Sequence, residues 1–357
     1  MRVLERLDEL YAIGGGPGAN RPHGSPAEDE AHRRAVSWLA DAGLEVEVDR
    51  HGNLFGHARG AASGEKVSHT VSDTCWVGSH LDTVPQGGRF DGALGVVAAI
   101  EAVERVGMGS VVVFRGEEVG CVGSRALVAA GASLPRAFLE LHVEQGPVLA
   151  ERDAPLGVVT GIVGYARGEL VLDGRAGHAG TTPMVGREDA LVAAAAEVLR
   201  VRDAALAIEA AVATIGQVDV EPGGANVIPS RVRLSLDVRA PDAERLDALI
   251  ATIGFQPSYL VEPAQFAGVA PQALREAIAA RGLPTVELPS GAGHDAGILA
   301  STGVDAAMLF VRSLNAGVSH SPDELSSDDD VALAVDVLTD ALARLVEGEA
   351  SLAPTTP

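Results

Sequence analysis

Aromatic residues are scarce in this chain. They account for 3% of its 357 residues, whereas hydrophobic residues of all kinds account for 47%. The length is sufficient for two domains with a large buried core, so that core must be built from alanine, valine and leucine. Cysteine is scarcer still, because Cys75 and Cys121 are the only two, and this excludes a disulfide framework.

Basic charge is also in short supply. The chain has 27 lysine and arginine residues against 49 aspartate and glutamate residues, and its formal net charge is -22. Nucleic acids and anionic membranes attract basic surfaces, so neither is an expected partner. The apolar run from Gly92 to Ile100 is stopped by Glu101 and is too short to span a bilayer. Residues 1–6 lack the apolar core of a signal peptide, and we expect a cytoplasmic protein.

Histidine and carboxylate residues, by contrast, recur at the ends of apolar, strand-like segments, where α/β sheets build their sites. Residues 76–77 lead to a His-x-Asp, residues 111–114 to a Glu-Glu pair, and residues 137–139 to a further histidine. Imidazole and carboxylate are ligands of zinc, manganese, cobalt and nickel. Five candidates suit two metals that share a carboxylate, with a spare glutamate for hydrolysis. The five are His80, Asp91, Glu118, His142 and His320.

Each of these segments also has a purely structural interpretation. A lone His-x-Asp is more often a surface pair or a buried, hydrogen-bonded histidine than a ligand. Residues 111–114 could form a buried strand that ends in a solvated acidic turn. Alternate residues of a strand share a face, so Asp82 is placed to hold the imidazole of His80 as a supporting partner.

The pattern of elements predicts an α/β fold with a mixed sheet. A helix is expected at 26–42, with Ser25 as its N-cap, a strand at 44–48, a helix at 92–106 and a helix at 329–346. Strands that alternate with helices indicate a sheet covered on both faces. Residues 61–72 are small and polar and predict a flexible loop, and residues 351–357 predict a disordered tail.

A second pattern begins after residue 164. Strands are expected at 167–173, 211–218, 231–239 and 255–261, with helices at 189–202 and 242–253. This β-α-β-β-α-β order is typical of an α+β ferredoxin-like sandwich. We therefore expect a metal-binding catalytic domain of residues 1–164 and 269–357, with an inserted lid and dimerisation domain of residues 165–268.

Several motifs resemble those of the hydantoinase/carbamoylase amidases. This group contains the N-carbamoyl-L-amino-acid hydrolases and allantoate amidohydrolases, within the dinuclear-metal aminoacylase and carboxypeptidase superfamily. The most specific motifs are His-Val-Glu-Gln-Gly at 142–146, His-Ala-Gly-Thr-Thr-Pro-Met at 178–184 and Gly-Ala-Gly-His-Asp-Ala at 291–296. Other matching segments are 49–56, 78–94, 226–229, 235–239 and 317–322, in the family's order over nearly the whole chain.

The resemblance implies a role for each candidate ligand. It implies two divalent ions, zinc or manganese, with cobalt or nickel as alternatives. His80 and His142 would bind one ion, Glu118 and His320 the other, and Asp91 would bridge them. Glu117 would be the general base.

The resemblance also implies how a substrate is held. The lid histidine of the family reaches across a homodimer into the partner's site, and further residues hold the substrate carboxylate and the ureido end. In this chain the lid histidine is His178, the carboxylate-binding residues are Asn226 and Arg239, and the ureido end is surrounded by Gln145, Gly291, Ala292 and Gly293, with His294 beside them. Without the family, a salt bridge with Asp237 or Asp242 would be the favoured interpretation of Arg239.

The implied activity is hydrolysis of the ureido C–N bond of an N-carbamoyl-L-amino acid or an allantoate-like substrate, which releases ammonia and carbon dioxide. One alternative is an aminoacylase or dipeptidase of the same superfamily. Another is a non-catalytic binding protein on the same fold, which the presence of Glu117 and all five ligand candidates disfavours. The segment from Val119 to Leu141 is shorter than the family's usual one, and its first part, residues 119–125, lacks the family's usual aromatic residue, so we expect a different pocket wall.

Overall fold

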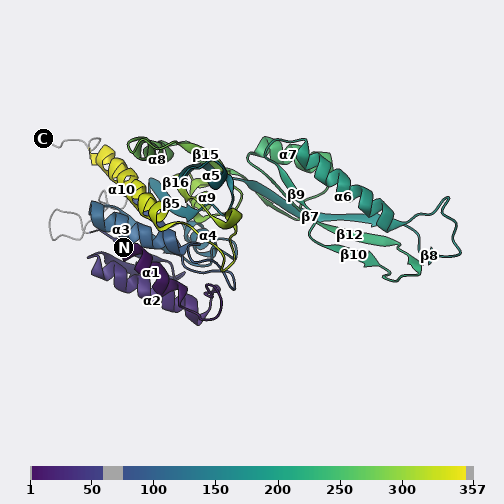
Figure 1. Cartoon of the computed structure of the whole chain (residues 1–357), viewed down its shortest axis with the longest axis horizontal. Coiled ribbons are helices and arrows are strands. Elements are labelled where there is room, and N and C mark those ends of the chain that lie inside the picture. The colour runs from purple at the N-terminus through teal and green to yellow at the C-terminus, as the bar shows by residue number, and fades with distance from the viewer. Residues whose placement is uncertain (1, 59–74, 351–357) are drawn as a thin grey trace. The chain divides into compact units, whose positions relative to one another are not determined.

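The computed structural model describes residues 2–58 and 75–350 (Figure 1). The predicted loop at 61–72 and the predicted tail at 351–357 lie outside the described residues. The chain forms two compact units, of which the second is inserted into the first. The first unit runs to Gly161 and resumes at Gln265, and the second comprises Ile162–Ala264.

The described part of the first unit is organised around a nine-stranded mixed sheet. Strands β3, β4, β5 and β16 are mutually parallel, and β1, β2 and β6 run antiparallel to their neighbours. In spatial order the strands are β1 (Glu45–Val48), β2 (Leu54–His57), β4 (Ser110–Phe114), β3 (Cys75–His80), β5 (Ala137–Val143), β16 (Asp305–Val311), β6 (Leu156–Ile162) and β14 (Ala264–Gln265), and β15 (Val286–Ser290) also pairs with β6.

Helices cover both faces of this sheet (Figure 1). On one face α10 packs against both α3 and α8, which contact β3 and β16 respectively, and on the other α4 and α9 pack against each other. The helices are α1 (Arg2–Tyr11), α2 (Pro26–Asp41), α3 (Ala93–Val106), α4 (Val122–Ala129), α5 (Val148–Glu151), α8 (Val269–Ala279), α9 (Asp295–Ala300) and α10 (Asp328–Ala350), with a short 3-10 helix η2 (Asn315–Gly317).

Burial on both faces explains the composition of the strands. Leu139 and Leu141 of β5 belong to the core under α3 and α10, whereas Phe138 is buried from the opposite side and packs edge-on against Phe114. Strands that are covered twice read as continuous apolar runs rather than as alternating ones. The prediction of an α/β fold with a mixed sheet is confirmed.

Local signals in the sequence account for the start of α2. Ser25 has extended backbone angles, and its Oγ accepts a hydrogen bond from the backbone N–H of Glu28 at 3.2 Å. Pro26 occupies the first helical position, where its missing N–H costs nothing. The predicted cap and the predicted helix are confirmed.

The second unit is a five-stranded antiparallel sheet with two helices on one face. Its order is β10-β12-β7-β13, with β9 also paired to β12. Alternate residues of β12 are buried under α6 and α7. The elements are β7 (Gly164–Asp173), α6 (Ala190–Leu206), β9 (Val212–Thr214), β10 (Val218–Glu221), β12 (Arg231–Ala240), α7 (Ala243–Ile253) and β13 (Tyr259–Val261), and a separate two-stranded pair joins β8 (Gly177–His178) to β11 (Val227–Ile228).

Two predicted strands of this unit are wrong in extent. The one expected at 255–261 is a strand only over β13 (Tyr259–Val261). Residues 211–218 were expected to form a single strand, but the structure divides the segment into β9 and β10, which pair with different parts of β12. Gly216 lies between them and offers no side chain to pack on the sheet. None of the described helices is both long and apolar enough to cross a membrane.

Candidate metal centre

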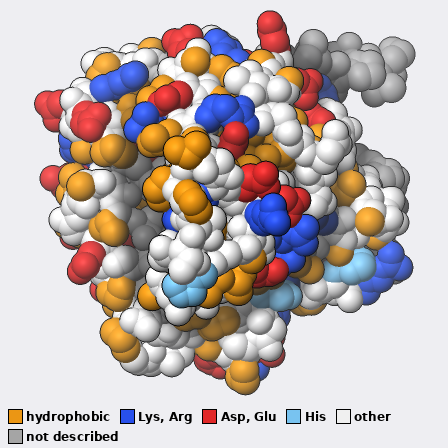
Figure 2. Space-filling model, turned by 90° about the vertical axis from the view of Figure 1, so that its right-hand side faces the viewer, with side chains coloured by type: hydrophobic (Ala, Val, Ile, Leu, Met, Phe, Trp, Pro, Cys, Tyr) orange, Lys and Arg blue, Asp and Glu red, His pale blue; other side chains and the backbone are white. Residues whose placement is uncertain are grey.

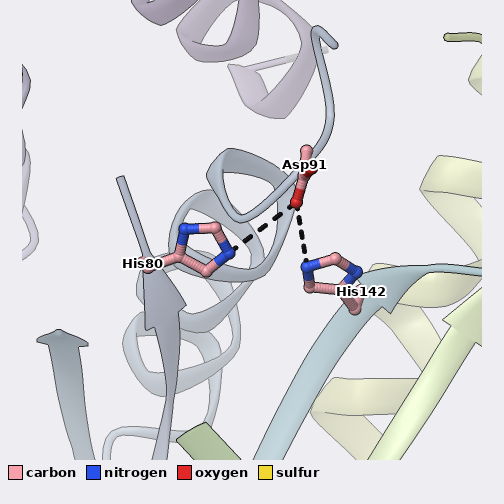
Figure 3. A group of neighbouring side chains, drawn as sticks. All are labelled: His80, Asp91 and His142. Atoms are coloured by element: carbon pink, nitrogen blue, oxygen red, sulfur yellow. Dashed lines mark ion pairs between the residues drawn. The ribbon is translucent and has the colours of Figure 1, made fainter. Parts of the chain in front are cut away.

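Asp91 is the residue around which the predicted ligands gather. Its Oδ1 lies 3.2 Å from Nε2 of His142 and 3.7 Å from Nε2 of His80, and Figure 3 shows the carboxylate between the two rings. Its Oδ2 lies 3.4 Å from Nε2 of His320. The two oxygens of one carboxylate therefore face two different groups of ligands, which is the arrangement that a bridging ligand requires.

The two groups differ in burial. The first consists of His80, Asp91 and His142, all buried; the second consists of Asp91, Glu118 and His320, and in each the candidate ligand atoms lie within 4.8 Å of one another. The side chain of His320 is 52% exposed, and its Nε2 lies 3.5 Å from Oε2 of Glu118. We call these two groups the inner position and the outer position.

The fold orients the imidazoles of the inner position. His80 is the last residue of β3 and His142 lies next to the end of β5, so the two parallel strands deliver both rings to one edge of the sheet. Nδ1 of His80 contacts the carbonyl oxygen of Asp82 at 3.1 Å, and Nδ1 of His142 contacts that of Val143 at 3.0 Å. Backbone acceptors at Nδ1 leave Nε2 of each ring to face Asp91.

Gly92 makes room for one of these rings. Its φ is +63°, and a Cβ built at this position would lie 2.5 Å from Cε1 of His80. Only glycine combines that backbone conformation with that close approach. Because Gly92 has no side chain, the backbone next to Asp91 can pass close to the ring of His80.

Asp82 fixes the Glu-Glu pair as well as His80. Its Oδ1 accepts the backbone N–H of Glu117 and its Oδ2 accepts that of Glu118, each at 3.1 Å, and Oδ1 lies 3.4 Å from Nδ1 of His80. A single buried carboxylate thus links the end of β3 to the turn after β4. Asp82 thus lies within contact distance of His80, and its supporting role stays a prediction.

Burial and charge shift the pKa values of the cluster in opposite directions. Burial, and then the negative charge of Asp91, raise the pKa of Glu118 to about 8. Burial acts in the same direction on Asp91, but contact with His142 and the charges of the neighbouring histidines outweigh it and hold its pKa below the usual value. Burial opposes the protonation of His142, but Asp91 outweighs it and raises the pKa of His142 to about 9. Asp91 is therefore the carboxylate that keeps its negative charge at the centre of the cluster.

Three of the candidate ligand atoms are buried without a hydrogen-bond partner among the described residues. They are Nε2 of His80, Nε2 of His142 and Oε1 of Glu118. Buried polar atoms that lack a partner are rare and costly in folded proteins. Imidazole nitrogens and carboxylate oxygens of this kind suit zinc, manganese, cobalt or nickel. The residues present fit a divalent metal ion.

Glu117 lies beside the ligands and belongs to neither group. Its Oε2 is 3.8 Å from Nε2 of His80, and its Oε1 is 3.4 Å from Nδ1 of His294. Nε2 of His294 contacts Oγ of Ser290 at 3.0 Å, and the ring of His294 packs on that of His142 with centroids 4.5 Å apart. The carboxylate of Glu117 thus lies at the edge of the inner position, within ion-pair distance of His294.

The residues predicted around the ureido end are divided between two loops. The amide Nε2 of Gln145 donates to Oδ2 of Asp91 at 3.1 Å and to Oγ of Ser319 at 3.0 Å. Residues 291–293 connect β15 to α9, and the backbone N–H of Ala292 donates to Oγ of Ser290 at 3.2 Å. Through Ser290 and His294 this loop reaches Glu117.

Two residues of the second unit that were expected to act together are separated. Asn226 lies beside His178, because its carbonyl oxygen accepts the backbone N–H of Ala179 at 3.0 Å. Arg239 is eight residues from Arg231 in β12, and Arg231 is the end of that strand nearer to Asn226 in sequence; eight residues of strand span roughly 27 Å. The structure does not bring Asn226 and Arg239 together within one chain.

Arg239 has partners of its own. Its Nε donates to Oδ1 of Asp237 at 2.8 Å, and its guanidinium lies over the ring of Tyr165 at 5.4 Å. The salt bridge with Asp237 that the sequence offered as a structural alternative is therefore present. His178 and Asn226 are both exposed.

Sequence reasoning misplaced the contacts of one residue of the first unit and missed another. His294 was placed near the ureido end rather than against Glu117, although its Gly-Ala-Gly-His-Asp motif marked the loop. Glu324 was not predicted at all, yet its buried carboxylate accepts the backbone N–H groups of Phe90 and Asp91. It lies four residues after His320 and beyond a turn, where no strand-end pattern could indicate it.

Two groups of candidate ligands share one carboxylate at the strand ends of an α/β sheet, beside a glutamate that belongs to neither, and this is the arrangement expected of a metal-dependent hydrolase. The chain belongs to peptidase family M20/M25/M40, whose model matches residues 76–344.

Within this family, the chain is similar to amidohydrolases among both curated relatives and solved structures. The chain is 34% identical over 413 aligned positions to an N-carbamoyl-L-amino acid amidohydrolase of Geobacillus stearothermophilus, covering 98% of this chain and 99% of the relative. It is 32% identical to the allantoate amidohydrolase of Bacillus subtilis, over 88% and 90% of the two chains. A hydantoinase/carbamoylase family amidase of Burkholderia multivorans superposes with a TM-score of 0.83, at 29% identity over 97% of both chains. The predicted family is confirmed.

Proposed function

We propose that this amidohydrolase binds two divalent ions and hydrolyses the ureido C–N bond of an N-carbamoyl-L-amino acid. The observation that carries the proposal is the placement of Asp91, whose two oxygens face two ligand groups, next to a glutamate that belongs to neither. The relatives named for N-carbamoyl-L-amino acids and for allantoate support this substrate class.

When bound, divalent ions at these positions supply Lewis acidity to the carbonyl group and lower the pKa of water. The chain's own part falls to Glu117. Its carboxylate accepts a proton from the attacking water, whose oxygen joins the ureido carbon, and returns that proton to the leaving nitrogen as the C–N bond breaks. The products are the amino acid and carbamate, and carbamate decomposes to ammonia and carbon dioxide.

Residues of the second unit would hold the rest of the substrate. A guanidinium binds a carboxylate through two parallel hydrogen bonds, which suits Arg239 to an amino-acid carboxylate. His178 would donate to the oxygen that becomes negative in the transition state. Because Asn226 lies beside His178 and far along the sheet from Arg239, we propose that His178 and Asn226 act together, and in the partner's site.

An apolar stripe on α6 supports a homodimer. Four large apolar side chains at helical spacing lie on one side of α6 and are exposed, and a fifth lies at its end; they are Leu191, Val192, Val198, Leu199 and Leu206. Figure 2, which faces the right-hand side of Figure 1, shows apolar side chains exposed among charged ones. A continuous apolar stripe on a surface helix marks an interface, and we assign it to a second copy of this chain.

A substrate panel tests the activity. Purified protein supplied with Mn²⁺ should release ammonia and free amino acid from N-carbamoyl-L-amino acids, and Glu117→Gln measured in parallel should not. The panel includes allantoate, 3-ureidopropionate, N-acetyl-amino acids and dipeptides. Turnover of N-acetyl-amino acids or dipeptides alone would overturn the ureido assignment in favour of an aminoacylase or a dipeptidase, and preference for allantoate would move it within the ureido class.

A further inference from the structure

Glu324 is a buried carboxylate that contacts the metal centre without supplying a ligand to either position. It is 5% exposed. Its Oε1 accepts the backbone N–H of Phe90 at 2.7 Å and that of Asp91 at 3.1 Å, and its Oε2 accepts the hydroxyl of Ser319 at 2.7 Å. One carboxylate therefore joins the loop that carries Asp91 to the residue that precedes His320.

The backbone around Gly88 is shaped to admit this carboxylate. A Cβ built on Gly88 would lie 2.1 Å from Oε1 of Glu324. No side chain fits there unless the carboxylate moves, because real Cβ atoms do not approach an oxygen so closely. The segment from Gly88 to Asp91 thus encloses Glu324 with a bare backbone on one side and two N–H donors on the other.

Gln145 provides a second link between Ser319 and Asp91. Nε2 of Gln145 donates both to Oγ of Ser319 and to Oδ2 of Asp91. Glu324, Ser319, Gln145 and Asp91 form a ring of hydrogen bonds in which Oδ2, the oxygen that faces the outer position, is included. The inner-position contacts of Asp91 use its other oxygen, Oδ1.

The outer position needs such support more than the inner one. His80 and His142 are held by strands and are buried, whereas His320 is half exposed and has a left-handed backbone with φ of 52°. An exposed ligand on a turn has no packing to fix it. Its place relative to Asp91 must come from bonded neighbours, and Ser319 is the neighbour that Glu324 holds.

We propose that Glu324 is a positioning residue for the outer metal position. It holds Asp91 and His320 at the separation that a shared ion requires and leaves the inner position largely independent. This inference rests on the two-metal site proposed above. Partners behind the ligands usually change metal affinity by about 10–100-fold.

The test is a titration of metal-free protein with Co²⁺, followed by absorption and by elemental analysis after gel filtration. Wild type should bind two ions. Glu324→Ala should keep the tight ion and bind the second about 10–100-fold more weakly, with the absorption of the retained ion unchanged. It should resemble His320→Ala, which lacks an outer ligand. Glu324→Gln keeps an oxygen that can accept from the two N–H groups, so its affinity for the second ion should fall less. This variant provides the test if Glu324→Ala does not fold.

The chain offers a matched control. Oδ2 of Asp305 accepts the backbone N–H groups of Val269 and Ala270 at 2.7 and 3.1 Å, the same pair of distances, and a Cβ on Gly268 would lie 2.0 Å from Oδ1 of Asp305. These residues cap α8 and contact none of the ligands. Asp305→Ala and Gly268→Ala should lower thermal stability and retain both ions, whereas Gly88→Ala should weaken the second ion as Glu324→Ala does.

Each outcome decides between the proposals. Two ions bound by Glu324→Ala with wild-type affinities would overturn the role of Glu324 and leave the two-metal site intact. Equal weakening of both ions, reproduced by Asp305→Ala, would reduce Glu324 to a general stabilising residue and overturn the inference. A wild type that binds one ion would overturn the two-metal proposal itself.

Discussion

The two units of this protein differ in how far their candidate functional residues are buried and gathered together. The first unit brings its predicted ligands, its base and their supporting residues into one cluster, and most of these side chains are buried. The second unit leaves His178 and Asn226 exposed and separates Asn226 from Arg239 along the sheet. The candidate ligands of a single chain thus gather within one core, whereas the residues proposed to hold the substrate do not gather within their own unit. The predictions below test that contrast.

The largest expected effect lies in the first unit. Glu117→Gln should lower kcat by about 10²–10⁴-fold, because the general base is removed, and should retain both ions. Glu118→Gln is the matched control, because the adjacent carboxylate should lose an ion instead. The measurements are the activity and the metal content of both variants. If Glu117→Gln loses an ion and Glu118→Gln does not, the roles of base and ligand are interchanged.

A smaller loss is expected from the second unit. His178→Ala should lower kcat by about 10²–10³-fold through the loss of one donor to the transition state, again with both ions retained. Loss of an ion in this variant would break the contrast, because it would make a residue of the second unit part of the metal chemistry.

Mixed dimers show in which chain His178 acts. Inactive Glu117→Gln and His178→Ala chains are combined under conditions that allow exchange. If the histidine acts in the partner's site, one site of each mixed dimer regains both an intact base and an intact histidine. Activity that stays at the level of the unmixed variants, with exchange confirmed by mass, would place the histidine in its own chain.

Disruption of the α6 stripe should act through assembly. Leu199→Asp places a charge in the stripe, so it should yield monomers in sedimentation and an activity no higher than that of His178→Ala, because each site then lacks the partner's residues, with both ions kept. Leu260→Asp is the control, since Leu260 is an exposed leucine of β13. A monomeric Leu199→Asp with wild-type activity would show that the second unit is not needed by a partner.

The smallest effect concerns acid stability. Burial, and then the charge of Arg115, lower the pKa of His32 to about 3, against an ordinary value of 6.5. Between these values the unfolded chain binds a proton that the folded chain does not, so stability is lost as the pH falls from about 6.5 towards 3. His32→Asn should lose less between pH 7 and pH 4.5 in urea unfolding. His178→Asn, which changes the exposed histidine of the second unit, should not alter that difference.

Strand ends explain why most of the metal centre could be predicted. His80 and His142 follow apolar runs, and parallel strands bring such positions to one edge whatever the intervening sequence. The strand-end argument does not cover His320, which follows η2 rather than a strand; the sequence offered it as a further imidazole near the C-terminus.

The parts that could not be predicted depend on contacts between distant segments. Glu324 acts through backbone N–H groups of Phe90 and Asp91, more than 230 positions away, and such donors leave no mark in a side-chain pattern. His294 meets Glu117 because α9 begins beside β5. The break between β9 and β10 was indicated by Gly216, but the flanking apolar residues favoured one long strand.

The parallel direction of β4 and β5 also bears on how this family changes length. The alignment with the Geobacillus relative has 413 positions and this chain 357 residues, so at least 56 positions have no counterpart here. Residues 130–136 connect α4 to the beginning of β5, which is the end of that strand away from His142. A change of length at that connection would act at the opposite end of β5 from the candidate ligand His142. The fold therefore offers, at residues 130–136, a position for insertion or deletion at the strand end opposite to the candidate metal centre.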